Sequence, residues 1–158
     1  MRRRDREVTD RTQMLDILRR CEVISVAFSG ETPYVIPMSF GFEETDGALR
    51  IYLHGAQTGE KTDRLMRNPC VAFSLFTGNQ IVDSGTACAY TTTYESVCGT
   101  GTVTMLDGVE KRHGLRILMA HYAPGKTFDF SEAVLAQTCV MRIDADSLSG
   151  KRRGHPSA

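Results

Sequence analysis

The sequence has 158 residues, which is typical of one domain large enough to bury its own hydrophobic core. Its 19 Lys and Arg balance its 19 Asp and Glu, so no overall charge would attract nucleic acid or an anionic membrane, and any anion must bind at a local site. No segment is apolar over the length that crosses a bilayer, and the five cysteines lack the spacing of a metal site, so we expect a cytoplasmic protein with free thiols.

The N-terminal third predicts one helix and three consecutive antiparallel strands. The helix begins at Asp10, because Asp10 and Gln13 have the spacing of a capping box and apolar residues then recur at helical intervals. Apolar, β-branched and aromatic runs separated by turn-forming residues, among them Asp46-Gly47, follow this helix. They predict strands at residues 23–29, 34–42 and 48–54.

The rest of the chain alternates short helices and strands. Helices are predicted at residues 58–68, which end before Pro69, at residues 107–122 with Asp107 as N-cap, and briefly at residues 131–137. Strands are predicted at residues 70–77, twice within residues 86–106 after a turn at Gly78-Asn79, and at residues 138–145.

Residues 1–150 are therefore predicted to form one domain, followed by a disordered tail at residues 151–158. About six short strands in hairpin order, with few helices, predict a mainly β fold of the α+β kind. We expect a closed or nearly closed antiparallel barrel with flanking helices.

The strand-to-helix junction from His54 to Lys61 has the composition of a phosphate site. Gly55 and Gly59 allow the backbone to approach a ligand, a helix N-terminus offers free N–H groups, and Lys61 adds a positive charge. Glu60 stands where a Walker loop would need lysine, so the segment is not that motif. An ordinary capped turn, with His54 as an exposed polar residue, explains the same pattern.

Residues 94–101 are the second candidate segment. Small residues alternate along this predicted strand, notably Gly99 and Gly101, and they would let a flat ligand or another backbone come close. On these residues alone, a simple bend of the barrel is the favoured explanation of the pattern.

Four segments, in this order, resemble the NimA-related branch of the pyridoxamine 5′-phosphate oxidase-like split barrels, which is associated with 5-nitroimidazole resistance. They are residues 1–7 with the following helix, 33–42, 52–69 and 94–101. The resemblance spans nearly the whole chain. It implies an antiparallel split β-barrel that forms a homodimer, with flavin at the subunit interface. The flavin is usually FMN, and FAD is the alternative.

The resemblance also assigns roles to residues of this chain. It implies that the backbone of residues 35–39 runs beside the flavin ring, that His54 lies near the ring as the one candidate catalytic residue, and that Lys61 meets the phosphate. The expected cofactor-binding residues are Val35, Ile36, Pro37, Met38, Ser39, His54, Gly55, Lys61, Tyr94, Ser96 and Val97. Those from residues 94–97 would come from the same subunit or from its partner, and Tyr122 would line the substrate side.

Three residues depart from the pattern of the relatives. Gly55 removes a hydroxyl and Glu60 removes a positive charge from the expected phosphate site. Glu95 also places a carboxylate beside the site, which would disfavour a phosphate unless its side chain points away. The expected activity is that of a flavin-dependent oxidoreductase on a small-molecule acceptor, with nitroaromatic compounds as candidates. The alternatives are a non-catalytic flavin- or nucleotide-binding module, and vitamin B6 phosphate oxidation, for which we find no second basic cluster.

Overall fold

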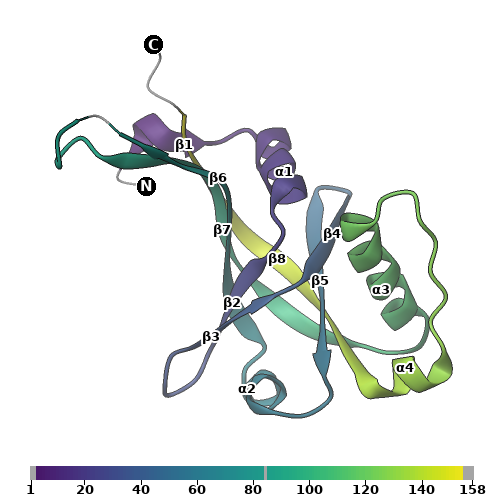
Figure 1. The fold of residues 1–158 in the computed structure, drawn as a ribbon. Helices are drawn as coiled ribbons and strands as arrows, with labels where there is room; N and C mark the ends of the chain where they lie inside the picture. The colour runs from purple at the N-terminus through teal and green to yellow at the C-terminus, as the bar shows by residue number, and fades with distance from the viewer. Residues whose placement is uncertain (1–2, 84, 155–158) are drawn as a thin grey trace.

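A computed structural model describes residues 3–83 and 85–154 and contains one curled antiparallel sheet of eight strands (Figure 1). The strands are β1 (Glu7–Val8), β2 (Ile24–Phe28), β3 (Tyr34–Met38), β4 (Phe40–Thr45), β5 (Ala48–Ala56), β6 (Cys70–Val82), β7 (Thr91–Leu106) and β8 (Thr138–Arg153). The helices are a 3-10 turn η1 (Arg4–Arg6), α1 (Arg11–Arg20), α2 (Glu60–Arg67), α3 (Gly108–Tyr122) and α4 (Glu132–Gln137). Neighbouring strands follow the order β3-β2-β6-β7-β8-β5-β4, and β1 pairs with β8. This arrangement confirms the antiparallel split barrel with flanking helices.

The split lies at residues 34–42, which form two strands rather than the single predicted one. The chain turns a corner at Ser39, so β3 and β4 lie at opposite ends of the strand order. Tyr122 of α3 holds this corner, because its hydroxyl accepts a hydrogen bond from the Phe40 N–H at 3.0 Å and donates one to the Glu22 carbonyl at 2.6 Å. A run of strand-forming residues does not reveal such a corner, since both halves have the same composition.

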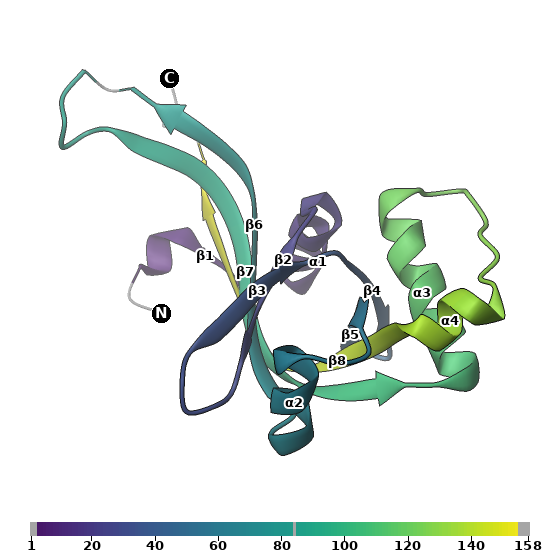
Figure 2. The same cartoon turned by 60° about the horizontal axis from the view of Figure 1, so that its bottom comes forward.

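The predicted turn at Gly78-Asn79 is wrong. Both residues lie within β6, where Gly78 has a φ of +69° and its carbonyl accepts a hydrogen bond from Thr93 Oγ1 at 2.8 Å. The pairing with β7 shifts register here, so the glycine forms a β-bulge instead of a turn. Residues 86–106 hold only one strand, and the β6–β7 hairpin projects beyond the barrel (Figure 2).

The closing strand is longer than predicted. β8 continues past residue 145 to Arg153, because it pairs with β7 on one side and with β5 and then β1 on the other. Lys151, for example, pairs with both Glu7 and Ser96. The tail prediction is therefore wrong for residues 151–153, while residues 155–158 lie outside the described part of the chain.

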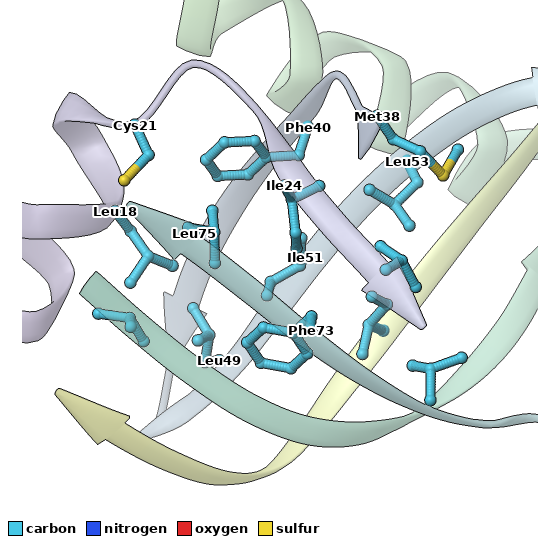
Figure 3. Close-up of a cluster of buried hydrophobic side chains, with 14 of the residues drawn as sticks. Leu18, Cys21, Ile24, Met38, Phe40, Leu49, Ile51, Leu53, Phe73 and Leu75 are labelled. Atoms are coloured by element: carbon cyan, nitrogen blue, oxygen red, sulfur yellow. The ribbon is translucent and has the colours of Figure 1, made fainter. Parts of the chain in front are cut away.

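The main core fills the barrel interior (Figure 3). Alternate residues of the strands face inward, among them Ile24, Phe40, Ile51 and Leu75, and each of these four is fully buried. A smaller core lies on the outer face of the sheet, beneath α3 and α4, and contains Tyr52, Leu106, Leu115, Leu135 and Val140. α3 and α4 thus cover part of the outer face of the sheet.

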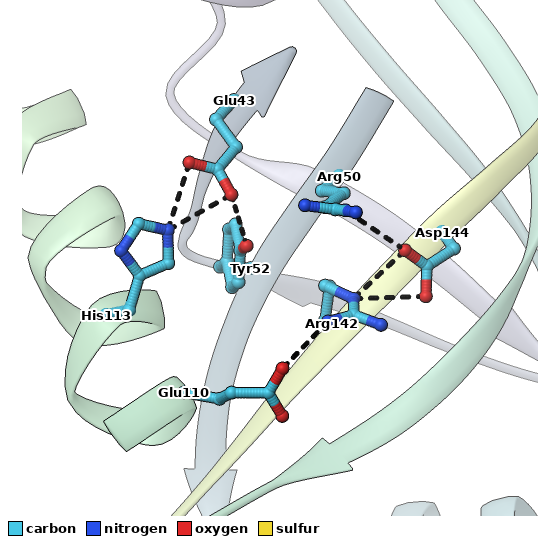
Figure 4. A network of polar contacts seen from close by, with 7 residues as sticks. All are labelled: Glu43, Arg50, Tyr52, Glu110, His113, Arg142 and Asp144. Carbon is cyan, nitrogen blue, oxygen red and sulfur yellow. Dashed lines mark hydrogen bonds and ion pairs between the residues drawn. The ribbon is translucent and has the colours of Figure 1, made fainter. Parts of the chain in front are cut away.

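A polar network joins α3 to the sheet beside the smaller core (Figure 4). Glu43 accepts hydrogen bonds from the Tyr52 hydroxyl at 2.5 Å and from His113 at 3.0 Å, and Arg142 contacts Asp144 with its Nε at 3.0 Å. The pKa of Tyr52 is raised mainly by burial and also by its hydrogen bond to Glu43. The phenol therefore stays protonated and donates its hydrogen bond to Glu43. None of the predicted site residues belongs to this network.

The five cysteines are free, as predicted. Cys21 and Cys139 are buried and act as small hydrophobic residues, and burial raises the pKa of Cys21 to about 11. The other three, Cys70, Cys88 and Cys98, are exposed. In the described part of the chain, no helix is long and apolar enough to cross a membrane.

Candidate functional site

The junction between β5 and α2 leaves a helix N-terminus open. Gly59 is the N-cap of α2 with a φ of +125°, a conformation that favours glycine, and it has no side chain that could accept from the first N–H groups. Thr62 turns its hydroxyl back to the Gly59 carbonyl at 2.7 Å, so it does not cap the helix either. Free N–H groups and the helix dipole make this end attractive to an anion.

Lys61 points into the same junction. The residue is only 9% exposed, and its ammonium makes one hydrogen bond, to the Ala56 carbonyl at 3.3 Å. It makes no ion pair within the described residues, so two of its three N–H donors lack a protein acceptor. Burying an ammonium with so few hydrogen-bond acceptors and no counter-charge destabilises the ligand-free protein. A bound anion would supply both the acceptors and the negative charge.

Gly55 and Met38 lie beside this ammonium. A Cβ atom on Gly55 would sit 3.2 Å from the Lys61 Nζ and 3.9 Å from the Met38 Cε, so the glycine leaves the space that the lysine occupies. The structure therefore brings together three predicted site residues from β3, β5 and α2. This convergence is the arrangement that the phosphate prediction requires.

The remaining β3 residues alternate between the two faces of the sheet. Ile36 and Met38 pack toward the barrel core, whereas Val35 and Pro37 face outward and Val35 is 62% exposed. Ser39 is exposed at the corner. The outer side of β3 thus offers an open surface beside the backbone, next to small residues of β2 such as Ser25 and Ala27, which pair with Pro37 and Val35.

His54 lies on the other face of β5 from Gly55 and Lys61. Leu53 and Gly55 point to the barrel interior, while His54 points outward and is exposed. It makes no hydrogen bond or ion pair within the described residues. The structure therefore does not bring His54 to the phosphate end of the junction, and its catalytic role stays a prediction from the family resemblance.

The predicted β7 residues lie three strands away from β3 in the sheet. Ser25 pairs with Pro37 of β3 and with Ser74 of β6, and Ser74 pairs with Cys98 of β7, so this part of β7 is about 14 Å from β3 at about 4.8 Å per strand. Tyr94 and Ser96 are partly exposed, but Val97 is fully buried in the barrel core, so it could meet a ligand only through its backbone.

Glu95 does not point toward a ligand. Its carboxylate accepts hydrogen bonds from Arg20 of α1 and, at 2.5 Å, from the Arg152 Nε of β8. These bonds hold the pKa of Glu95 below its ordinary value of 4.5, and the bond from Arg20 has the largest effect. Burial acts in the opposite direction and raises this pKa. The carboxylate ties α1 to the sheet, and the expected repulsion of a phosphate does not arise.

We expect Glu95→Gln to lower the free energy of unfolding by about 2 kcal/mol near pH 7, because an amide weakens two charge-assisted hydrogen bonds. Since the pKa of Glu95 is lowered by folding, its stabilisation is complete above the unfolded pKa near 4.5 and is lost as the pH falls through the folded pKa. Urea unfolding of both proteins at about pH 7 and about pH 3 measures this loss.

The matched control is Glu132→Gln, which changes a carboxylate that is 85% exposed and has one arginine partner. It should change stability by less than about 0.5 kcal/mol. A difference between wild type and Glu95→Gln that stays constant with pH would contradict the assignment of the effect to this carboxylate.

Arg64 is the residue that the sequence analysis missed. It is 8% exposed and donates to the Thr32 carbonyl at 2.5 Å and to the Glu60 carboxylate at 2.6 Å, while its guanidinium lies 5.0 Å from the centre of the Tyr34 ring. A Cβ on Gly30 would come within 2.5 Å of this guanidinium. The signal in the sequence is the pair Lys61 and Arg64, two cations one turn apart on the buried side of a short helix.

The fold defines the class of protein: an antiparallel split barrel, with a candidate anion site where β5 meets α2. A sequence model of the pyridoxamine 5′-phosphate oxidase family matches residues 10–152, and the chain belongs to this family. The resemblance found in the sequence is thereby confirmed. A search of curated proteins finds no significant match.

Solved structures agree with this assignment. A proposed 5-nitroimidazole antibiotic resistance protein from Bacteroides thetaiotaomicron is 30% identical with a TM-score of 0.79, over 92% of this chain and 86% of that chain. An FAD and haem binding protein from Mycobacterium smegmatis is 22% identical with a TM-score of 0.81, over 97% and 76%. A flavocytochrome from Azotobacter vinelandii is 20% identical with a TM-score of 0.81, over 99% and 73%. The chain thus has the split-barrel fold of this family.

Proposed function

We propose that this protein binds a flavin nucleotide with its phosphate at the N-terminus of α2. The observation that carries this proposal is the Lys61 ammonium, which is buried and has a single carbonyl partner at 3.3 Å. Gly55 and the uncapped first turn of α2 border the same space, so a phosphate would gain one charge-assisted hydrogen bond and several backbone donors. The residues present fit the group that the fold implies.

The flavin ring would lie along the outer side of β3, against the backbone of residues 35–39. Pro37 has no N–H and its neighbours across the sheet are small, which suits a flat ring placed against the strand. When bound, the flavin supplies the electron-transfer chemistry. The protein binds and orients it and shields one of its faces from water.

Two copies of the chain would share each site. Tyr94 and Ser96 lie on β7, which is three strands away from β3 in the sheet of their own chain. In a homodimer, the outer face of β7 from one copy can cover the flavin of the other. We propose such a homodimer, in the cytoplasm, whose substrate is a small molecule.

The reaction that we propose is electron transfer to a small acceptor of the nitroaromatic kind. The 30% identical relative, named for 5-nitroimidazole resistance, supports this acceptor class. His54 is the one candidate for a proton donor, and its outward position means that it would act on a substrate at the outer face of the sheet.

The absorbance spectrum of the purified protein tests flavin binding, and mass spectrometry of the released cofactor identifies it. We expect a yellow protein, or a colourless one that binds added flavin and elutes as a dimer in light-scattering chromatography. A colourless protein that binds neither FMN nor FAD would contradict the proposal.

A non-catalytic flavin-binding module is the second candidate. It is favoured by the lack of any hydrogen bond or ion pair, within the described residues, that would orient His54, the one candidate proton donor. Anaerobic reduction of the bound flavin followed by addition of a 5-nitroimidazole separates the candidates, because only an enzyme should reoxidise faster than free reduced flavin. Vitamin B6 phosphate oxidation has less support, since the other buried cation of α2, Arg64, is already paired with the Glu60 carboxylate and hydrogen-bonded to Thr32.

A further inference from the structure

A polar cleft runs along the side of α2 that faces the β2–β3 loop. Its volume is about 350 Å³, within the range of small-molecule sites. The loop residues that line it belong to 29–32, and the helix contributes Glu60, Arg64, Arg67 and Asn68. None of the predicted cofactor-binding residues lines this cleft.

The floor of the cleft is rigid. Arg64 donates three hydrogen bonds, one to Glu60 and two to Thr32, and these hold the β2–β3 loop against α2. Gly30 makes this contact possible, because any side chain at that position would strike the guanidinium. The ion pair also neutralises Glu60, which the sequence analysis identified as an unfavourable charge beside a phosphate.

The walls of the cleft carry groups without protein partners. Arg67 and Glu31 are exposed and make no hydrogen bond or ion pair within the described residues. Asn68 accepts a hydrogen bond from the Cys70 N–H at 2.9 Å through its carbonyl oxygen, which leaves its amide N–H groups free. The cleft therefore offers one guanidinium, one carboxylate and one amide donor.

We propose that this cleft holds the adenylate half of FAD, so that the cofactor is FAD rather than FMN. The inference rests on the proposed flavin site at Lys61. α2 is eight residues long, about 12 Å at 1.5 Å per residue, and it leads from the proposed phosphate site to Asn68 at the far end of the cleft. A nucleoside monophosphate attached to the flavin phosphate would follow this helix.

The three free groups match the parts of adenosine. A carboxylate such as Glu31 accepts hydrogen bonds from ribose hydroxyls, as acidic residues do in dinucleotide sites. The Arg67 guanidinium can stack on a purine, and the Asn68 amide can donate to a ring nitrogen. With Glu31 and Glu60 balancing Arg64 and Arg67, the cleft suits the uncharged adenosine better than a further phosphate.

Calorimetric titration of the flavin-free dimer with FMN and with FAD tests this inference. We expect FAD to bind at least tenfold more tightly than FMN. Arg67→Ala should reduce this preference to less than threefold and leave the affinity for FMN unchanged. Arg116→Ala, which removes an exposed arginine of α3 outside the cleft, is the matched control and should keep the preference.

Equal affinities of the wild type for FMN and FAD would overturn the adenylate site and leave the flavin site intact. A preference for FAD that survives in Arg67→Ala, or an Arg67→Ala variant that loses FMN and FAD affinity equally, would also overturn it. A protein that binds neither nucleotide would contradict the proposed function itself.

Discussion

Lys61→Met is expected to weaken flavin binding about 100-fold, which corresponds to about 2.8 kcal/mol. The loss is large because the Lys61 ammonium is buried and its one protein partner is a carbonyl at 3.3 Å, so most of its interaction energy depends on the bound anion. Methionine has a similar length and helix propensity, so it fills the same space beside Gly55 without the charge. The free energy of unfolding of the flavin-free protein should stay the same or rise slightly.

Calorimetric titration with flavin, and urea unfolding without it, measure these two effects separately. Lys126→Met is the control, because Lys126 is exposed in the α3–α4 connection and makes no ion pair within the described residues. A Lys61→Met variant with unchanged flavin affinity would show that the phosphate lies elsewhere. A large loss of stability in the flavin-free variant would show instead that Lys61 has a structural partner.

The phosphate end of the site could be predicted from the sequence because its signals are local. Gly55, Gly59 and Lys61 lie within seven residues, and the physical requirements of a strand-to-helix anion site apply to such a short segment directly. Arg64 could not be found in this way, since its partners Thr32 and Tyr34 are about thirty residues earlier in the chain and only the fold brings them together.

The strands were predicted well where alternation and turns mark their ends, and poorly where tertiary pairing sets their length. β5 and its Asp46-Gly47 hairpin follow the prediction, with a φ of +52° at Asp46 and +76° at Gly47. β8 is eight residues longer than predicted, because its polar second half is stabilised by β1 and β7 on either side rather than by its own hydrophobic pattern. Pairing with neighbouring strands thus decides the length of β8 more strongly than its amino-acid composition does.

Gly41→Ala is expected to lower the free energy of unfolding by about 3 kcal/mol, the largest effect on stability among these variants. A Cβ atom on Gly41 would lie 2.5 Å from the Ile117 carbonyl oxygen and 2.5 Å from the Leu118 Cα, which are backbone atoms of α3. A flexible side chain could rotate away, but a helix backbone must move as a unit, and the smaller core beneath it would open.

A displacement of α3 should also weaken flavin binding, because Tyr122 at the end of this helix holds the corner where β3 is followed by β4. Urea unfolding measures the stability, and titration of the folded variant with flavin measures the second effect. Gly154→Ala is the control, since a Cβ there meets nothing within 4 Å and its φ is not positive. A Gly41→Ala variant as stable as wild type would mean that α3 can shift on the sheet without loss of packing, and then Tyr122 could not be what fixes the split of the barrel.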